Sequence, residues 1–535
     1  MINGVGTFAR SASVLAAALL VSCAGLPPGA AFPRRESVAL EDLQGTTLGA
    51  HFSKLSDDHP DRSGFRVLSV GVDGFVARIR MVEMAERALD LQYYIFRGDE
   101  TGVLLMTALV GAADRGVRVR ILVDDGDKVD GDERLARLDG YKGIEVRIFN
   151  PFRYRGSSRF FRALEFIGNS RRLDYRMHNK LIVADNAVAL IGGRNVGDQY
   201  FQTQPETQFA DDDVFVAGPA VRALSTTFDR FWNDGLSIPA AALRVASAPT
   251  AAAELLAPAP RRRRHAPAAV ASGIDYGERV AAGAPIAGIM DGTLTLVWAP
   301  ASVYADPPDK RRALGTGTGG RVVADAVAVA AGRTQADLLI VTPYLVPAAE
   351  ELETLHSLRR RNATVRVLTN SLASTRDVIA FAGYARIRGS LAMDGIGLFE
   401  TRANLADARG SGQTMHMSRY GNYGLHAKLW VFDDELVFIG SMNFDQRSKR
   451  INTEVGLIID SPELASQVTA RFERMIVPGN AYAVTMRDMG HGVHRLSWET
   501  SEAGTPANYS VDPATSVWRR WAVRLLSVVP LDREL

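Results

Sequence analysis

HNKLIVADNAVALIGGRN, from His178 to Asn195, occurs a second time in the chain as HAKLWVFDDELVFIGSMN, from His426 to Asn443. Both copies have the form H-x-K, four residues, Asp, six residues, Gly-[Gly/Ser]-x-Asn. Each matched residue of the second copy lies 248 positions after its counterpart in the first. A single H-x-K tripeptide is common by chance, whereas four polar residue types kept in register over two copies indicate a duplicated functional unit.

Each copy predicts a strand that carries phosphate chemistry. LIVAD (181–185) and LWVFD (429–433) are apolar runs of strand length. Because residues i and i+2 of a strand share one face, the His and Lys of each motif can point together into a cleft. The glycines let the backbone approach a ligand closely, Lys suits phosphate as a point charge, and His can be nucleophile or general acid. Two copies supply both histidine roles; the alternative is a pair of buried structural histidines.

The stretches before the motifs repeat as well, in the order helix, strand, helix, strand. In the first half, the spacing of apolar residues predicts a helix over 72–89, a strand over 89–96, a helix that begins at Thr101 and ends at Gly116, and a strand over 117–125. The second half repeats this order over 321–333, 336–347, 348–361 and 364–371. The duplication therefore covers a whole domain.

This element order implies an α/β fold with mixed, mainly parallel sheets and covering helices. Because one copy supplies only one motif histidine, a site with two of them needs both copies. We expect two similar α-β-α sandwich lobes related by a pseudo-twofold axis, with the active site at the lobe interface. We place the lobes at residues 40–245 and 291–490.

Composition is consistent with two such lobes. The chain has 535 residues, of which 47% are hydrophobic, and a net charge of +2. This charge argues against a general polyanion binder but allows a local basic cleft. Residues 246–290 are rich in Ala, Pro and Arg and predict a linker or insertion, whose Arg261–Arg264 run suits anionic lipid head groups, nucleic acid or simple solvation.

The N-terminus has the features of a lipoprotein signal. Arg10 precedes the apolar run 11–22, which is short for a membrane span. The following Leu20-Val21-Ser22-Cys23 resembles the bacterial lipobox, in which cleavage exposes the cysteine for lipid attachment. We expect a signal peptide over 1–22, lipidation of Cys23 and a tether over 23–39; the alternative is an ordinary signal peptide or a buried cysteine.

Two further observations concern the anchor. Cys23 is the only cysteine, so the chain forms no internal disulfide. Ala24 stands where many Gram-negative bacteria use Asp to mark retention in the inner membrane. The sequence therefore predicts a lipid-anchored protein of the cell envelope, on the periplasmic face of the outer membrane.

Two stretches combine Arg with large apolar residues. The expected C-terminal extension, 491–535, contains SVWRRWAVRLLSVVPL at 516–531, which predicts a helix at a membrane interface or an element packed on the second lobe. NPFRYRGSSRFFRALEF at 150–166 interleaves aromatic residues with Arg just before the first motif. Its aromatic side chains suit acyl chains beside a phosphate, or simply the packing of a surface helix.

The duplicated motif resembles the His-Lys-Asp signature of the phospholipase D superfamily, and the resemblance extends from about Gly64 to Leu535. LDLQYYIFRGDETG at 89–102, ADRGVRVRILVDD at 113–125, FDRFWN at 228–233 and the stretch 426–462 are most similar to the C-type bacterial cardiolipin synthases. The resemblance implies an enzyme that breaks phosphodiesters through a phosphohistidine. No metal or cofactor is implied, because each motif offers one His and no zinc-type Cys/His cluster is present.

The resemblance also assigns roles to residues. His178 is expected to attack phosphorus, and His426 to protonate the leaving alcohol and deprotonate the incoming one. The non-bridging phosphate oxygens are expected to be bound by Lys180, Lys428, Asn195 and Asn443. Asp185 and Asp433 support the site rather than react. Acids that orient the imidazoles are expected at Glu454 in the second lobe and, in the first, within Asp211–Asp213, where Asp212 or Asp213 matches best by position.

The implied function is a phosphatidyltransferase of cardiolipin synthase type. The substrates expected are phosphatidylglycerol and phosphatidylethanolamine at a membrane surface, with no nucleic acid partner. A monomer is expected because both motifs are in one chain. A hydrolytic phospholipase D that releases phosphatidic acid, or a phosphodiesterase or nuclease of the same superfamily, is the alternative, and the motifs alone do not separate them.

Overall fold

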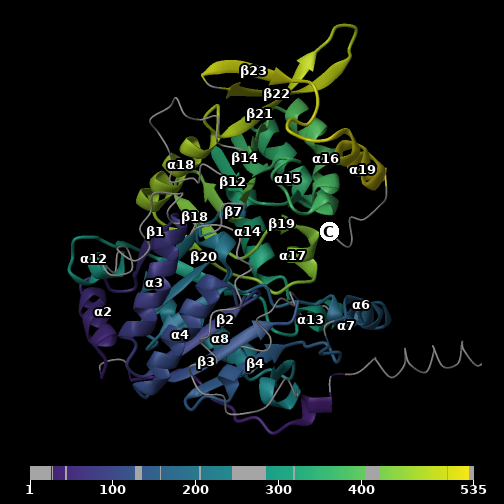
Figure 1. Cartoon of the computed structure of the whole chain (residues 1–535). Coiled ribbons are helices and arrows are strands. Elements are labelled where there is room, and N and C mark those ends of the chain that lie inside the picture. Colours follow the sequence, from purple (N-terminus) through teal and green to yellow (C-terminus); the bar gives the residue numbers. More distant parts are fainter. Residues whose placement is uncertain are drawn as a thin grey trace, which may run out of the picture.

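The computed structural model describes residues 26, 28–42, 45–126, 135, 137–156, 158–203, 207–243, 285–316, 320–403, 422–502 and 504–528. Within these ranges the chain forms two lobes, each built on one large mixed sheet (Figure 1). Cys23 and Arg261–Arg264 lie outside the described residues.

The first sheet has nine strands. They are β1 (Ser63–Leu68), β2 (Ala88–Tyr93), β3 (Arg118–Asp124), β4 (Ile144–Phe149), β5 (Leu181–Ala184), β6 (Val188–Gly192), β8 (Asp213–Ala217), β9 (Ser237–Pro239) and β10 (Val297–Ala299). Their order across the sheet is β10-β1-β8-β6-β5-β2-β3-β4-β9. The two motif strands, β5 and β6, therefore lie at the centre.

The second sheet has ten strands. They are β11 (Ala301–Ala305), β12 (Asp337–Val341), β14 (Thr364–Asn370), β15 (Gly397–Thr401), β17 (Leu429–Phe432), β18 (Leu436–Gly440), β20 (Val455–Asp460), β21 (Ala481–Asp488), β22 (His494–Glu502) and β23 (Thr505–Tyr509). Their order is β11-β20-β18-β17-β12-β14-β15-β21-β22-β23. From β11 to β21 this order matches that of the first sheet from β1 to β9, which confirms the predicted domain duplication.

The sheets are mixed, but the expectation of mainly parallel pairing is wrong. Parallel pairs in the described sheets are β2–β3 and β3–β4 in the first and β12–β14 and β14–β15 in the second, and the other neighbouring strands pair antiparallel. The predicted β-α-β units do form parallel pairs. The motif strands reverse through tight turns, with Asp185 and Asn186 at positive φ, and such hairpins are antiparallel.

The helices follow the predicted positions closely. Those of the first lobe are α2 (Thr47–Asp57), α3 (Gly71–Met84), α4 (Glu100–Asp114), α6 (Arg159–Gly168), α7 (Ser170–Leu173), α8 (Pro219–Trp232) and α12 (Ile286–Met290), with the short 3₁₀ turns η1 (Pro28–Ala31), η2 (Asp198–Tyr200) and η3 (Ala240–Leu243). Those of the second are α13 (Lys310–Thr316), α14 (Val322–Arg333), α15 (Ala349–Arg360), α16 (Val378–Met393), α17 (Gln446–Arg450), α18 (Pro462–Ile476) and α19 (Val517–Val528). Asp99, not Thr101, caps α4, because its side chain accepts the Gly102 N–H.

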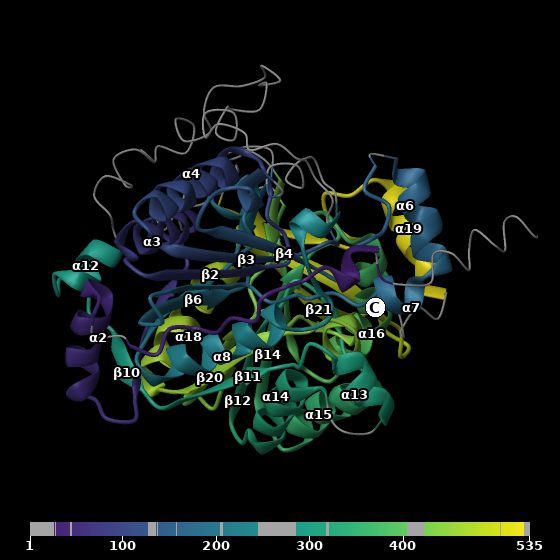
Figure 2. The same cartoon turned by 90° about the horizontal axis from the view of Figure 1, so that it is seen from below.

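Helices cover both faces of each sheet, as predicted for α-β-α lobes. The outer faces pack on α3 and α4 in the first lobe and on α14, α15 and α16 in the second (Figure 2). Between the sheets lies one shared core, which includes Phe228 and Trp232 of α8 and Val468 and Phe472 of α18. Each such buried side chain contributes about 1.5–3 kcal/mol, so this core holds the lobes together as one body.

The lobe boundaries differ from the expected ones. Strand β10 completes the first sheet by pairing with β1, and the chain crosses to β11 of the second sheet after Pro300. Helix α12 buries Ile286 and Ile289 in the first lobe, within the expected linker 246–290. Strands β22 and β23 extend the second sheet beyond residue 490. Residues 34–39 of the expected tether bind the first lobe, for example through Ala39 N–H to Asp229.

Two small sheets join the lobes and their loops. Strand β7 (Thr207–Ala210) of the first lobe pairs in parallel with β16 (Asn422–Leu425) of the second. Strand β13 (Leu345–Val346) pairs with β19 (Phe444–Asp445). Among the described helices, none has the length and apolar character needed to span a bilayer.

Candidate active site

The two His-Lys pairs lie in front of the central strands, β5 and β17, and each is tied to the opposite lobe. The backbone N–H of His178 donates to the Thr453 carbonyl at 3.0 Å, and that of His426 donates to the Ala210 carbonyl at 2.7 Å. Each motif therefore begins where its backbone is hydrogen-bonded to the other lobe, at Thr453 for the first motif and at strand β7 for the second. These two hydrogen bonds between the lobes hold both motifs at one interface, as the sequence predicted.

Each imidazole is held by a carboxylate of the other lobe. His178 Nδ1 lies 2.9 Å from Glu454 Oε2, and His426 Nδ1 lies 2.6 Å from Asp211 Oδ2. Glu454 was expected to orient an imidazole, and it contacts His178. The expectation of Asp212 or Asp213 is wrong. Asp212 pairs with Arg471 at 2.9 Å, and Asp213 pairs with Arg78 at 2.8 Å and with Arg194 at 3.0 Å.

Strand register explains why Asp211 is the counterpart of Glu454. Gly192 of the first motif pairs with Asp213, and Gly440 of the second pairs with Gly456. The residues two positions earlier are Asp211 and Glu454. Asp211 lies 16 residues after Asn195, whereas Glu454 lies only 11 after Asn443. Counting from the motif misses this match, whereas aligning the apolar strands β8 and β20 finds it.

Both imidazoles are neutral in the substrate-free site. Burial lowers the pKa of His178 well below its ordinary 6.5, and the charges of Lys180 and Lys428 lower it further. Burial and then Lys428, whose Nζ lies 3.1 Å from Nδ1, lower the pKa of His426 to about 3. Asp211 opposes this lowering at His426. Because each lysine acts on both rings, the two pairs form a single electrostatic site.

The supporting acids differ in charge. Burial raises the pKa of Glu454 to about 7, although Lys180 attracts the ionised form. Burial also acts to raise the pKa of Asp211, but His426, Lys428 and Arg194 together hold it below 3.8. Asp211 is therefore ionised at neutral pH, while Glu454 is partly protonated. Burial likewise lowers the pKa of Lys428 to about 8.

The motif glycines contact protein rather than ligand, which corrects their expected role. A Cβ on Gly193 would lie 2.1 Å from Asp211 Oδ1, so only glycine leaves room for that carboxylate. Ser441 stands at the same place in the second motif and donates its hydroxyl to Glu454 Oε2 at 2.5 Å. The Gly-[Gly/Ser] step therefore packs each motif against the acid that holds the opposite histidine.

The motif aspartates lie away from the imidazoles. Asp185 accepts the backbone N–H groups of Glu86, Arg87 and Ala88, at 2.8–2.9 Å. Asp433 does the same for residues 335–337, with Ala336 N–H at 2.7 Å. Each carboxylate thus fixes the start of the strand beside its motif, consistent with a supporting role.

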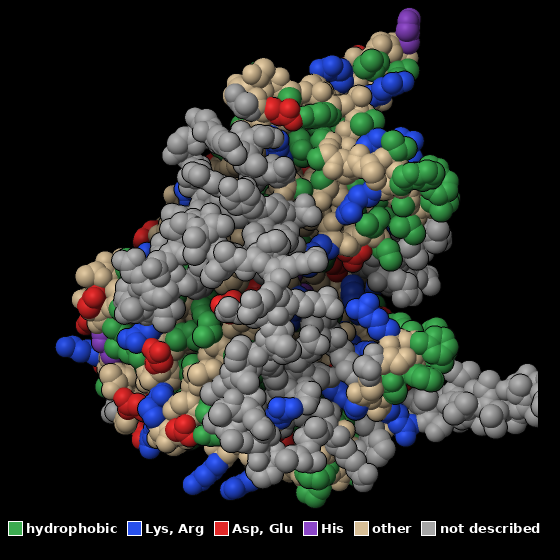
Figure 3. Space-filling model, in the orientation of Figure 1, with side chains coloured by type: hydrophobic (Ala, Val, Ile, Leu, Met, Phe, Trp, Pro, Cys, Tyr) green, Lys and Arg blue, Asp and Glu red, His purple; other side chains and the backbone are tan. Residues whose placement is uncertain are grey.

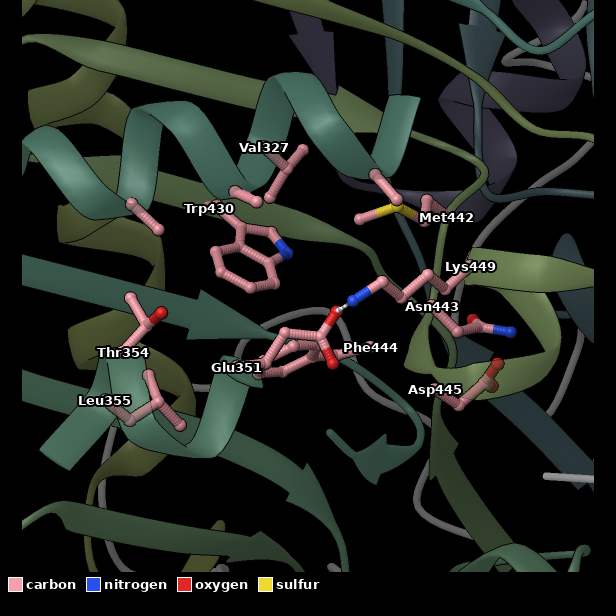
Figure 4. A pocket seen from close by; sticks show the side chains of 13 residues that line it. Val327, Glu351, Thr354, Leu355, Trp430, Met442, Asn443, Phe444, Asp445 and Lys449 are labelled. Atoms are coloured by element: carbon pink, nitrogen blue, oxygen red, sulfur yellow. Dashed lines mark ion pairs between the residues drawn. The ribbon is translucent and has the colours of Figure 1, made fainter. Parts of the chain in front are cut away.

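The two motif asparagines are placed differently. Asn195 accepts the Ile95 N–H at 3.1 Å and donates to the Tyr200 hydroxyl at 2.9 Å. Asn443 is also buried, but its Oδ1 has no hydrogen-bond partner among the described residues. Figure 4 shows Asn443 beside a small, mostly apolar cavity of about 30 Å³ behind the second motif, where Lys449 and Glu351 form an ion pair of 2.8 Å.

A buried brace that the sequence did not reveal supports Glu454. Asp306 Oδ2 accepts the Glu454 N–H at 3.0 Å and pairs with Lys310 Nζ at 2.7 Å. The same ammonium donates to the carbonyls of Ser448 and Asn452, at 2.8 and 2.7 Å. Asp306 directly follows β11 and Lys310 begins α13, and neither was predicted as a site residue. Their partners are more than 130 residues away, so no local pattern marks them.

Aromatic rings wall the site. Tyr94 meets His178 and Tyr200 meets His426 edge to face, with ring centroids 5.1 and 5.2 Å apart. Phe209 also contacts His426, at 5.4 Å, and lies 5.3 Å from Tyr200. These rings limit water around the imidazoles and leave each Nε2 as the nitrogen not used by a carboxylate. Neutral imidazoles flanked by two lysines suit nucleophilic and general acid-base chemistry on a phosphodiester.

Two helices expose apolar side chains on one side of the molecule. In α19 the most exposed are Val517, Trp518, Trp521, Leu525 and Val528, and in α6 Phe160, Phe161, Leu164 and Ile167. At 100° per residue each set falls on one helix face. Figures 1 and 2 place both helices on the same side, and Figure 3 shows hydrophobic side chains gathered over both. Helix α19 packs its other face on α16 through Val523, which confirms the predicted packing on the second lobe. The predicted contact with a membrane interface stays a prediction.

Comparison with known proteins identifies the family. The model of the family "Cardiolipin synthase, PLD-like domain" matches residues 79–232 and 330–476. Cardiolipin synthase C of Escherichia coli is 36% identical over 483 residues, 89% of this chain and 97% of that protein. The major cardiolipin synthase of Bacillus subtilis is 26% identical over 76% of this chain and 67% of its own length.

Among solved structures, phosphatidylserine synthase of Haemophilus influenzae covers 79% of this chain and 90% of its own, with a TM-score of 0.49 and 12% identity. The family match includes both lobes and both His-Lys pairs, and the match to the Escherichia coli protein runs nearly the full length of each chain. The chain therefore belongs to the cardiolipin synthase, phospholipase D-like family.

Proposed function

We propose that the chain is a phosphatidyltransferase that joins two phosphatidylglycerol molecules into cardiolipin and releases glycerol. The observation that carries this proposal is the pair of buried histidines, each oriented by a carboxylate of the opposite lobe and flanked by lysines. The similarity to cardiolipin synthases supports the lipid substrate.

In the first step, Nε2 of neutral His178 attacks phosphorus of the donor lipid and the bond to the glycerol oxygen breaks. The leaving oxygen takes a proton from His426. Lys180 and Lys428 balance the charge on the non-bridging oxygens. Before this step, the bound anionic phosphate offsets both lysine charges, which raises the pKa of His426 above its substrate-free value, and the ring takes up a proton from solvent. Ionised Asp211 stabilises the imidazolium that forms.

In the second step, His426 takes the proton of a hydroxyl on the acceptor lipid. That oxygen attacks phosphorus, the bond from phosphorus to His178 Nε2 breaks, and cardiolipin leaves. Water in place of the lipid hydroxyl gives phosphatidic acid instead. The assignment of His178 as nucleophile is supported by its partner, since a half-protonated Glu454 favours a neutral ring while Asp211 favours a charged one.

The test uses His178→Ala, His426→Ala and a phosphatidyl ester with a nitrophenol leaving group, which needs no proton to depart. With phosphatidylglycerol, both variants should lose about 10⁴-fold or more of their turnover. With the nitrophenyl ester, His426→Ala should still release one burst of nitrophenol and trap labelled phosphoenzyme on acid quench. His178→Ala should show no burst. A burst confined to His178→Ala reverses the two roles, and substantial turnover of phosphatidylglycerol by either variant refutes the mechanism.

The same proposal includes a membrane surface as partner and a chain that acts as a monomer. Support comes from the exposed apolar faces of α6 and α19, because a soluble protein rarely leaves such side chains in water without a partner. Trp beside Arg suits the boundary between head groups and acyl chains.

We also propose that Cys23 carries a lipid anchor at the periplasmic face of the outer membrane. The lipobox-like Leu20–Cys23 and the absence of Asp at position 24 support this. Labelled fatty acid should enter the wild-type protein and not Cys23→Ser, and the wild type should fractionate with outer membranes. A mature protein without label contradicts the lipid anchor. A labelled protein that fractionates with the inner membrane contradicts the outer-membrane location.

A further inference from the structure

We propose that a cavity beside His426 binds the phosphate of the acceptor lipid, separately from the phosphorus that reacts. The cavity has a volume of about 270 Å³. Its lining includes Phe209, Ser374, Thr375, Arg376, Gly424 and Arg519. The inference rests on the proposed function, because it concerns the lipid that receives the phosphatidyl group.

The cavity lies one aromatic ring away from the catalytic imidazole. The ring of Phe209 is 5.4 Å from that of His426, and the Arg376 guanidinium carbon is 5.4 Å from the ring of Phe209. Gly424 precedes His426 by two residues, and a Cβ there would lie 3.1 Å from the Ser374 carbonyl oxygen. In the proposed complex a glycerol group passes this ring, with its hydroxyl at His426 and its phosphate at the guanidinium.

The cavity is positively charged and its loop is fixed. Arg519, at the start of α19, donates from Nε to the Leu372 carbonyl at 3.0 Å and from Nη2 to the Thr375 carbonyl at 2.7 Å. The neighbouring carboxylate, Asp377, caps α16 by accepting the N–H groups of residues 379 and 380 at 3.0 and 2.9 Å. Two guanidinium groups therefore line the cavity, and guanidinium groups suit a phosphodiester. The hydroxyls of Ser374 and Thr375 also line it, but they donate to Asn370 Oδ1 and to the Asp377 carbonyl, at 2.9 and 3.2 Å.

This placement gives the cavity a role in choosing lipid over water. In phosphatidylglycerol the reactive hydroxyl and the phosphate are joined by three carbons, and the acceptor's phosphate stays intact through the reaction. Holding that phosphate presents the hydroxyl to His426 at high effective concentration, so transfer competes with hydrolysis. Arg519 belongs to the helix that exposes Trp518 and Trp521, so the acceptor's acyl chains can extend from the cavity towards the membrane.

The experiment compares the wild type with Arg376→Gln and with the double variant Arg376→Gln/Arg519→Lys, all as full chains in mixed micelles of phosphatidylglycerol. Cardiolipin, phosphatidic acid and exchange of labelled glycerol into phosphatidylglycerol are measured together. Glycerol has no phosphate, so its exchange reports folding and the donor step. The ratio of cardiolipin to exchange should fall roughly tenfold to a hundredfold in the variants, with a higher KM for the acceptor. Arg386→Gln, which removes the same charge from α16 outside the cavity, should keep the wild-type ratio.

The outcomes separate this inference from the proposed function. Unchanged ratios and acceptor KM in a wild type that makes cardiolipin overturn the cavity's role. An equal loss of cardiolipin, phosphatidic acid and exchange also overturns it, because the arginines would then serve the donor or the fold. A wild type that releases only phosphatidic acid refutes the proposed transfer itself, and with it the acceptor site.

Discussion

In the first half of the site, His178 faces Glu454, whose pKa burial raises to about 7. In the second, His426 faces Asp211, whose pKa is held below 3.8 by His426, Lys428 and Arg194 despite burial. The geometry is the same: Nδ1 to a carboxylate of the other lobe, and the backbone tied across the interface. The charge is different, so duplication of the fold has left the two histidines in different electrostatic surroundings.

A second difference lies one residue before each histidine. The Met177 N–H donates to Asp124 at 2.8 Å, and Asp124 pairs with Arg176 at 3.2 Å. The Leu425 N–H donates at 2.8 Å to Asn370, which has no charge. The carboxylate that supports His426 is therefore Asp211, and the backbone just before His426 is bound by the neutral amide of Asn370. This arrangement suits the role that we propose for His426, which loses a proton in the first step and gains one in the second.

The largest expected effect comes from neutralising the two acids separately. Asp211→Asn should slow turnover by about a thousandfold, because the His426 imidazolium loses its counter-charge in both steps. Glu454→Gln should cost only about tenfold to a hundredfold, since Gln still accepts from His178 Nδ1. Steady-state kinetics with phosphatidylglycerol measures both variants, and Asp212→Asn is the matched control for charge. Equal losses in the two variants would mean that the acids do not distinguish the histidines.

The next prediction concerns stability against pH, where the two halves should differ in sign. A carboxyl whose pKa is raised in the folded state stabilises the fold most below its unfolded pKa, and the benefit is lost as the pH rises through the folded pKa. For Glu454 this window runs from 4.5 to about 7, so Glu454→Gln should gain about 3 kcal/mol relative to the wild type across it.

For Asp211 the pKa is lowered, so its contribution is present above pH 3.8 and is lost only as the pH falls below that value. Asp211→Asn should therefore be destabilised by a constant amount between about pH 5 and about pH 8. Urea unfolding of each variant and the wild type across that range checks both statements. A pH-independent difference for Glu454→Gln would contradict the raised pKa.

The sequence predicted the parts of this comparison that are local. The duplicated motif placed β5 and β17 and both His-Lys pairs, because strand periodicity and motif spacing are properties of short stretches. It missed Asp211, since the five extra residues in the first-lobe loop shift any count from Asn195. It missed Asp306 and Lys310, whose partners come from 448–454. Apolar spacing predicted the α19 helix. It could not predict whether the apolar face packs on the protein or is exposed, because the spacing is the same in both cases.

A smaller effect should separate the motif asparagines. Asn195→Ala removes two hydrogen bonds and leaves the Ile95 N–H unpaired, so we expect about 1–3 kcal/mol of destabilisation. Asn443→Ala loses no side-chain hydrogen bond through Oδ1, so stability should change by no more than about 0.5 kcal/mol. If Asn443 binds phosphate, its kcat should fall about tenfold or more. Chemical denaturation and kinetics on both variants decide this, and a stability loss confined to Asn443→Ala would reverse the contrast.

The smallest effect on the chemistry should come from the exposed faces of α6 and α19, one in each lobe. Trp518 is 80% exposed and Phe160 is 66% exposed, so replacing either with Glu leaves the core intact. Trp518→Glu/Trp521→Glu and Phe160→Glu/Phe161→Glu should each weaken binding to phosphatidylglycerol vesicles by about tenfold or more, because charged side chains do not enter the acyl boundary.

Turnover of a short-chain, monomeric phosphatidylglycerol should stay within about twofold, since no docking is needed. Val329→Glu, at an apolar position on α14 that is 53% exposed, is the control and should bind vesicles normally. Co-sedimentation measures the binding. Loss in only one pair would assign docking to a single lobe, and unchanged binding in both pairs would remove these helices from the membrane contact.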